Sequence, residues 1–235
     1  HRGRIPASDA AAVAQLRAGG AVVMGKTVTT EFAFFSPGPT CNPHDHRRTP
    51  GGSSSGSAAA VAAGFIDAGL GSQTAASITR PASFCGVVGF KPSFGSYSLA
   101  GVGGLAPSFD TLGALSRNVA TMASVHAVLA NPTPVPTVSN VLTPHRVGIC
   151  RTPWWSEADS ATRNAIAEAA ATFGAETEVE DVDMTGFEDG AFLHAEITAF
   201  EAAQTLACQY AGRVEDLSPV LRRMLDHGMR IGRSE

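Results

Sequence analysis

Apolar positions along this chain fall into two patterns, which predict two kinds of element. Alanine-rich or apolar runs flanked by capping residues or glycines are typical of helices, and short apolar runs are typical of strands. The predicted helices cover residues 10–18, 57–63, 118–129, 159–173 and 218–229, and two further helices fill 187–210. The predicted strands cover residues 21–25, 65–70, 146–150 and 176–182. Because strands alternate with helices, the pattern predicts a layered α/β domain.

Polar residues and glycines mark the expected ends of two of these helices. Ser8 and Asp9 precede the first helix as N-cap candidates, and the glycine pair at 19–20 follows it as a stop. Ser156 is placed to cap the start of the helix at 159–173.

Proline-rich segments bear on how many domains the chain forms. Residues 36–56 contain several prolines and glycines and predict a loop, and the proline-rich stretch at 131–136 is the best linker candidate. Strand-forming residues resume soon after that stretch, so we expect a single domain over residues 1–235. Both ends are abrupt, which predicts that the chain is a piece of a longer protein.

Composition narrows the functional classes. Charged residues make up 16% of the chain and hydrophobic residues 44%, which argues against disorder. The formal net charge is −4, and the basic residues form no block longer than a pair, so we expect no nucleic-acid partner. No apolar run approaches the length of ~18 residues that a membrane span needs, and the N-terminal residues lack the apolar stretch of a signal peptide. We expect a soluble, cytoplasmic protein without a membrane partner.

The four cysteines and one histidine-rich loop are the candidates for disulfides or metal. The cysteines are scattered without a C-x-x-C pair, which predicts reduced thiols in a cytosolic protein. His44-Asp45-His46 lies beside Pro43 in a loop-like context, and no other ligand cluster supports it. We therefore expect a solvated loop and no metal site.

Two segments rich in serine and glycine carry the functional signal. Residues 51–57 read Gly-Gly-Ser-Ser-Ser-Gly-Ser, and residues 71–82 begin Gly-Ser-Gln-Thr-Ala-Ala-Ser. Each is followed by apolar residues that could anchor it. Hydroxyls placed on tight backbone at two neighbouring points predict a polar site in which main-chain N–H groups take part.

Three generic motifs fail on these segments. A phosphate-binding loop over 51–57 requires lysine where the chain has Ser57. A nucleophile elbow at 52–56 must follow a strand, but Arg47-Arg48-Thr49-Pro50 precedes it. A dinucleotide fingerprint starting at Gly69 has Thr74 at its third glycine position. What remains is a serine nucleophile without a histidine base, beside the successive N–H groups of residues 74–77.

The ordered set of motifs resembles the amidase signature family of serine hydrolases. The matching blocks are residues 24–32, 42–43, 50–64, 71–82, 84–93, 110–113 and 117–119. The likeness is close over about residues 5–125 and looser to about 225. It implies a layered α/β/α sandwich around a central mixed β-sheet, here incomplete.

The family's Ser–cis-Ser–Lys triad implies a role for several residues of this chain. Ser77 matches the nucleophile that forms the acyl-enzyme, and Ser53 matches the bridging serine on a cis peptide. The N–H groups of Thr74, Ala75, Ala76 and Ser77 match the oxyanion hole.

Two further residues match substrate-binding positions of the family. Ser54 matches a neighbouring polar support, with an ordinary helix cap as the alternative. Arg80 matches an arginine that contacts a substrate carboxylate in a subgroup, whereas the commoner pattern has its arginine one position earlier, at Thr79. A structural hydrogen-bond donor is the alternative for Arg80, and Asp110 is interpreted as bracing a turn.

Two departures from the family pattern stand out. The family's catalytic lysine lies N-terminal to the matched blocks, and this chain has no equivalent, because Lys26 matches a different, structural position. Ala76 replaces the usual glycine, which strains the loop if its φ is positive and changes little if its φ is negative.

The resemblance implies an amidase that hydrolyses a carboxylic amide to an acid and ammonia or an amine. It implies no metal and no organic cofactor, a small-molecule amide as partner, and it allows a homodimer. The alternatives are the amidase subunit of a tRNA-dependent amidotransferase and a non-catalytic binding protein on an amidase scaffold.

Overall fold

The computed structural model describes residues 5–130, 146–175 and 177–232, and these form two compact units. One unit comprises residues 1–135 with 196–235, and the other comprises residues 136–195. The linker predicted at 131–136 lies outside the described residues. Within the described residues, no helix has both the length and the apolar character to cross a membrane.

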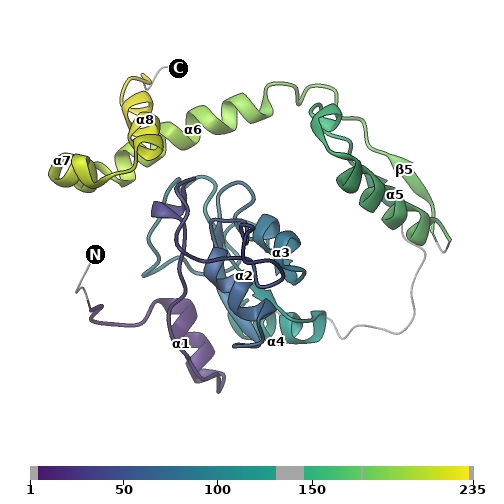
Figure 1. Ribbon diagram of the computed structural model, residues 1–235, viewed down its shortest axis with the longest axis horizontal. Coiled ribbons are helices and arrows are strands. Elements are labelled where there is room, and N and C mark those ends of the chain that lie inside the picture. Colours follow the sequence, from purple (N-terminus) through teal and green to yellow (C-terminus); the bar gives the residue numbers. More distant parts are fainter. Residues whose placement is uncertain (1–4, 131–145, 176, 233–235) are drawn as a thin grey trace. The chain divides into compact units, whose positions relative to one another are not determined.

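A three-stranded antiparallel sheet forms the centre of the first unit (Figure 1). β3 (Thr111–Ser116) lies in the middle, between β1 (Ala68–Gln73) and β2 (Val88–Phe90). Every residue of β3 is buried, as expected for a central strand covered on both faces.

Helices cover both faces of this sheet. α1 (Ala11–Ala18) and α4 (Val119–Leu129) pack over Leu112, with Ala12, Tyr97 and Leu129 buried between them. α2 (Ser55–Ala62) and α3 (Thr79–Cys85) pack over Leu115 on the other face. Leu112 and Leu115 point to opposite faces because side chains alternate along a strand. The first unit therefore has the layered α/β/α arrangement that the resemblance implies.

Glycines line the sheet face that α2 and α3 cover. A Cβ atom at Gly89 would lie 2.6 Å from the Cβ of Ala82, and one at Gly69 would lie 3.1 Å from the Cβ of Ser57. These two helices thus lie closer to the sheet than side chains at positions 69 and 89 would allow.

A helical layer at the C-terminal end completes the first unit. It contains most of α6 (Gly190–Thr205), followed by α7 (Ala207–Arg213), the 3₁₀ turn η3 (Val214–Asp216) and α8 (Pro219–Gly228). Its buried leucines pack with Leu105 and with the aromatic segment around η1 (Glu31–Ala33). The side chain of Ser218 caps α8 by accepting from the N–H of Leu221, and its own N–H donates to the carboxylate of Glu31 at 3.0 Å.

The second unit contains a parallel strand pair and one long helix. β4 (Val147–Ile149) pairs with β5 (Val179–Asp181), and they are accompanied by η2 (Trp155–Glu157) and α5 (Ser160–Gly174). Asp159, and not Ser156 as predicted, caps α5 by accepting from the N–H of Thr162. That hydrogen bond lowers the pKa of Asp159 below its usual value.

Three other sequence-based predictions were wrong in position or in detail. Residues 21–25 form no strand, because no described strand pairs with them and Val22 and Met24 are exposed. The strand expected at 65–70 begins at Ala68 instead, where pairing with β3 starts. Ala10 is the N-cap residue of α1 and makes no side-chain cap, while Asp9 forms an ion pair with Arg17.

Substituting Gly89 by alanine tests the close packing of the sheet. The new methyl group would overlap Ala82 and force α3 away from the sheet, so we expect the free energy of unfolding to fall by about 1–3 kcal/mol. Gly25→Ala is the matched control, because a Cβ there meets nothing within 4 Å. It should change stability by less than about 0.5 kcal/mol. Chemical denaturation measures both, and equal stability for the two variants would contradict the packing argument.

Candidate active site

The structure brings together the two serine segments that the sequence singled out. The N–H of Ser54 donates to the carbonyl of Ser77 at 3.1 Å, and Nε of Arg80 donates to the carbonyl of Gly52 at 2.9 Å. Ser53 and Ser77 are both buried, with exposed fractions of 3% and 6%. The first segment leads into α2, and the second forms the connection from β1 to α3.

The Gly52–Ser53 peptide bond is cis, as the resemblance implies for the bridging serine. The carbonyl of Ser53 accepts from the N–H of Thr30 at 3.1 Å and from the N–H of Ser55 at 2.8 Å. A Cβ atom at Gly52 would lie 2.8 Å from Cγ2 of Thr30. Hydrogen bonds from Thr30 and from Ser55 therefore hold the turn that carries Ser53.

The glycine-lined face of the sheet allows Ser54 and Ser57 to reach β1. A Cβ atom at Gly71 would lie 2.6 Å from Oγ of Ser54. Ser54 donates to the carbonyl of Ser72 at 3.4 Å, and Ser57 donates to the carbonyl of Leu70 at 2.7 Å. Ser54 thus supports the backbone that leads to Ser77, and its contact with substrate stays a prediction.

The loop that carries Ser77 contains main-chain N–H groups that donate no hydrogen bond within the described structure. Among the described residues, the N–H groups of Ala75, Ala76 and Ser77 donate no hydrogen bond. Positive φ values occur among the described non-glycine residues only at Phe32 and Ala33, so Ala76 adopts a backbone that alanine tolerates. Of the two alternatives left open by the sequence, the unstrained one holds.

Asp110 holds this loop to the segment before β3. One carboxylate oxygen accepts from the hydroxyl of Thr74 at 2.6 Å. The other accepts from the N–H groups of Leu105 at 2.7 Å and Ala106 at 3.0 Å. Asp110 is buried and braces a turn, which confirms the interpretation from the sequence. Its bond to Thr74 also braces the loop that carries Ser77.

Gln73 is a site residue that the sequence reasoning missed. It is the last residue of β1 and is buried, and its side-chain amide bonds to both ends of the loop that follows. The signal that could have found it is a lone amide side chain directly before a run of small residues, where the loop's own backbone groups need partners.

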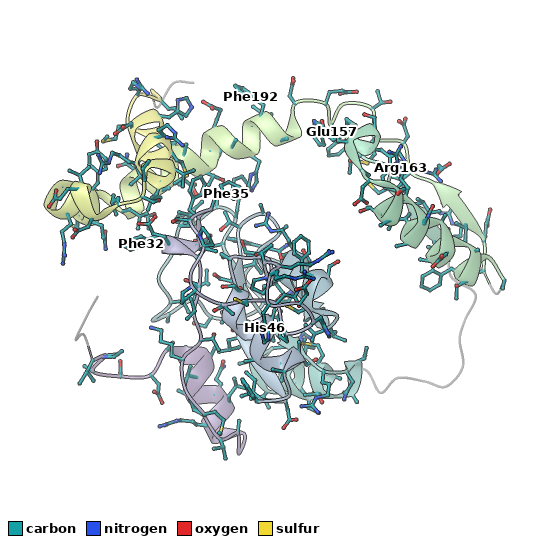
Figure 2. The ribbon with its side chains drawn as sticks, viewed as in Figure 1. Phe32, Phe35, His46, Glu157, Arg163 and Phe192 are labelled. Carbon is teal, nitrogen blue, oxygen red and sulfur yellow. The ribbon has the colours of Figure 1, made fainter. Side chains whose placement is uncertain are left out.

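Arg80 makes a structural contact at this site. Besides the Gly52 carbonyl, its guanidinium carbon lies 5.9 Å from the ring centroid of Phe35, within the range of a cation–π interaction. Phe35, which is labelled in Figure 2, follows η1 in the sequence and is 64% exposed. These contacts agree with the structural alternative for Arg80, and a role in substrate binding stays a prediction.

The sequence has two lysines, and neither is joined to the serine segments. Lys26 is exposed, and Nζ of Lys91 donates to the carbonyl of Pro92 at 2.7 Å. In the part of the chain that the structure describes, no lysine bonds to Ser53 or Ser77. Neither described lysine therefore takes the place of the family's catalytic lysine.

The histidine-rich loop makes structural contacts, and the cysteines form no disulfide. Nε2 of His44 is hydrogen bonded to the carbonyl of Cys85 at 2.8 Å, and Asp45 accepts from Arg47, which lowers the pKa of Asp45. The described residues contain no cluster of three or more metal-ligand side chains. All four cysteines are free, and burial raises the pKa of Cys85.

Comparison with known sequences identifies the family of this chain. The Amidase family model matches residues 1–230. The A subunit of the glutamyl-tRNA(Gln) amidotransferase of Synechococcus sp. (strain RCC307) is 39% identical over 226 residues, which are 86% of this chain and 46% of that protein. The protein of the same name from Methanospirillum hungatei is 46% identical over 135 residues, or 55% of this chain and 31% of that one. This chain therefore belongs to the Amidase family.

Solved structures agree with this assignment. A crystal structure of an amidase has a TM-score of 0.87 and 33% identity, and the match covers 96% of this chain and 53% of that one. The A subunit of the glutamyl-tRNA(Gln) amidotransferase from Thermotoga maritima has a TM-score of 0.76 and 29% identity, over 94% and 52% of the two chains. The fold is that of the amidase signature proteins, and the chain spans about half the length of these relatives.

Asp110→Ala and Thr74→Val together test how strongly the hydrogen bonds of Asp110 stabilise the protein. Asp110→Ala leaves two buried N–H groups and one hydroxyl without their acceptor, so we expect a loss of at least about 2 kcal/mol in the free energy of unfolding. Thr74→Val removes only the hydroxyl and should cost about 1 kcal/mol. Urea unfolding of both variants measures this order. A smaller loss for Asp110→Ala than for Thr74→Val would contradict the brace.

Proposed function

We propose that this chain carries the nucleophile and the oxyanion hole of an amidase that hydrolyses a carboxylic amide. The observation that carries the proposal is the contact between the two serine segments. The N–H of Ser54, next to Ser53, donates to the carbonyl of Ser77, and the N–H groups beside Ser77 are unused among the described residues. Membership of the Amidase family supports the reaction class. Ser77 and Ser53 are the proposed catalytic residues, and residues 74–77 form the proposed oxyanion hole.

In the proposed reaction, Oγ of Ser77 attacks the amide carbonyl carbon and passes its proton through the hydroxyl of Ser53 to a base. The new C–O bond moves the carbonyl electrons onto oxygen, and the N–H groups of the loop stabilise this charge. The C–N bond then breaks, and the leaving nitrogen takes the proton as ammonia or amine. Water attacks the resulting ester, releases the acid and restores Ser77.

The base is the remaining requirement of this mechanism. A neutral lysine serves it only if burial or nearby cations lower its pKa from the ordinary value of about 10.4. Lys26 is exposed, so it does not meet that condition. Lys91 is likewise exposed, so neither lysine of this sequence meets the condition.

A tRNA-dependent amidotransferase is the second candidate, and the names of the curated relatives favour it. In that case the same serine chemistry would release ammonia from an amide donor, and the protein would work in a stable complex with a further protein chain. Copurification of such a chain together with glutaminase activity would favour this candidate. Turnover of small amides by the isolated protein would favour the hydrolase.

The partner is a small-molecule amide bound near Ser77, with Ser54 and Arg80 as the substrate-binding candidates. Four free cysteines are in keeping with a cytoplasmic location. A homodimer stays a prediction.

Labelling with a fluorophosphonate probe, followed by peptide mass spectrometry, tests the nucleophile. We expect an adduct on Ser77 in the natural protein, and we expect Ser77→Ala to abolish it without a change in thermal unfolding. Ser83→Ala is the matched control, since Ser83 is exposed on α3 and should leave labelling intact.

Other outcomes of this experiment would overturn parts of the proposal. An adduct on Ser54 in place of Ser77 would move the nucleophile. A folded protein that binds amides tightly but takes no adduct would support the non-catalytic binding protein instead.

A further inference from the structure

The side chain of Gln73 both accepts and donates hydrogen bonds in the loop that carries Ser77. Its Oε1 accepts from the N–H of Ile78 at 2.9 Å, from the N–H of Thr79 at 3.0 Å and from the Thr79 hydroxyl at 3.3 Å. Its Nε2 donates to the carbonyl of Ala75 at 2.8 Å. A single buried side chain must therefore accept at one end of the loop and donate at the other, which is the chemistry of a primary amide.

The bond to Ala75 has a geometric consequence for the next residue. Within the described residues, the only cis peptide is Gly52–Ser53, so the peptide between Ala75 and Ala76 is trans and planar. In a trans peptide the C=O and N–H bonds point in opposite directions. By drawing the Ala75 carbonyl toward itself, Gln73 turns the N–H of Ala76 away, and that N–H has no partner among the described residues.

The following two peptides are fixed in the same way. The carbonyl of Ala76 accepts from the N–H of Arg80 at 2.8 Å, which turns the N–H of Ser77 away from α3. The carbonyl of Ser77 accepts from the N–H of Ser54, which turns the N–H of Ile78 toward Oε1 of Gln73. The N–H groups of Ala76 and Ser77 are thus each oriented by a hydrogen bond to the carbonyl of the same peptide.

We infer that Gln73 is a positioning residue of the active site, whose Nε2–H donor to Ala75 aims the N–H of Ala76 at the developing oxyanion. This inference rests on the proposed function, because it assigns a purpose to the N–H groups beside the nucleophile. Gln73 itself touches no reacting atom. It acts through the peptide plane, and its hydrogen bonds to residues 78 and 79 hold the far end of the loop while it does so.

Gln73→Glu separates the donor from the acceptors. The carboxylate keeps the acceptors for Ile78 and Thr79 but places a second acceptor against the Ala75 carbonyl. The peptide between Ala75 and Ala76 then loses the bond that orients the N–H of Ala76 toward the oxyanion. Loss of one oxyanion donor costs about 10²–10³-fold in rate in known enzymes. We expect the maximal rate of fluorophosphonate labelling at Ser77, kinact, to fall by about 10²-fold, with the reversible binding constant KI of the probe unchanged.

Two controls accompany this variant. Gln204→Glu makes the same chemical change on the exposed face of α6 and should leave kinact and KI unchanged. Thr79→Val removes the longest acceptor contact of Gln73 and keeps its donor, so kinact should change by less than about threefold. A merely structural role of Gln73 would instead lower the folded fraction, which thermal unfolding reports.

Hydrogen exchange of the natural protein provides a test that needs no variant. The N–H of Ala76 should exchange rapidly in the free protein and slowly once the Ser77 adduct places a phosphoryl oxygen beside it. Rapid exchange of Ala76 in the adduct would overturn the inference even if Gln73→Glu fails to fold.

Labelling of the natural protein and of Gln73→Glu distinguishes a failure of the proposed function from a failure of the role given to Gln73. If the natural protein takes no adduct on Ser77, the proposed function fails and this inference fails with it. If the natural protein is labelled and folded Gln73→Glu is labelled at the same kinact, only the role of Gln73 fails.

Discussion

Everything at the candidate site depends on how closely α2 and α3 approach one face of a small sheet. That face carries glycines at 69, 71 and 89, and the atoms facing them are the side chains of Ser57, Ser54 and Ala82. Because no side chain stands between, the serine hydroxyls of α2 reach the main chain of β1 directly. The two serine segments lie together because glycines leave room for this approach and because hydrogen bonds join them.

The site itself is organised mainly by main-chain groups. The side chains of Gln73 and Arg80 bond to backbone groups beside the two serines. Asp110 bonds to the N–H of Leu105 and to the hydroxyl of Thr74. Such an arrangement suits catalysis of acyl transfer, where fixed dipoles stabilise a charge that appears only in the transition state. It also explains how alanine at position 76 fits, since the orientation of its peptide is imposed by neighbours and its φ is not positive.

Much of this could be predicted from the sequence, for identifiable reasons. The serine segments were found because small residues in such density do not build a core, and the cis turn at Ser53 followed from the resemblance. The helices at 118–129 and 218–229 carried enough apolar residues to be placed closely.

The strand expected at 21–25 failed because apolar character alone does not supply a pairing partner. The caps of α1 and α5 failed because several polar residues stood near each start, and the sequence does not tell which backbone N–H each one meets. Gln73 was missed because its importance lies in where the following peptides point.

The register of one strand pair has a consequence for how this protein can vary. Gln73 is the last residue of β1 and lies opposite Thr111, the first residue of β3, and Asp110 immediately precedes Thr111. The two side chains that hold the loop carrying Ser77 therefore lie at the same end of this strand pair. A slip of a single residue would turn Gln73 to the opposite face of the sheet and break both supports at once. Insertions in the long connection between β2 and β3 are therefore tolerable only when they leave that pairing intact. The length of this connection can therefore vary, but the alignment of β3 against β1 cannot.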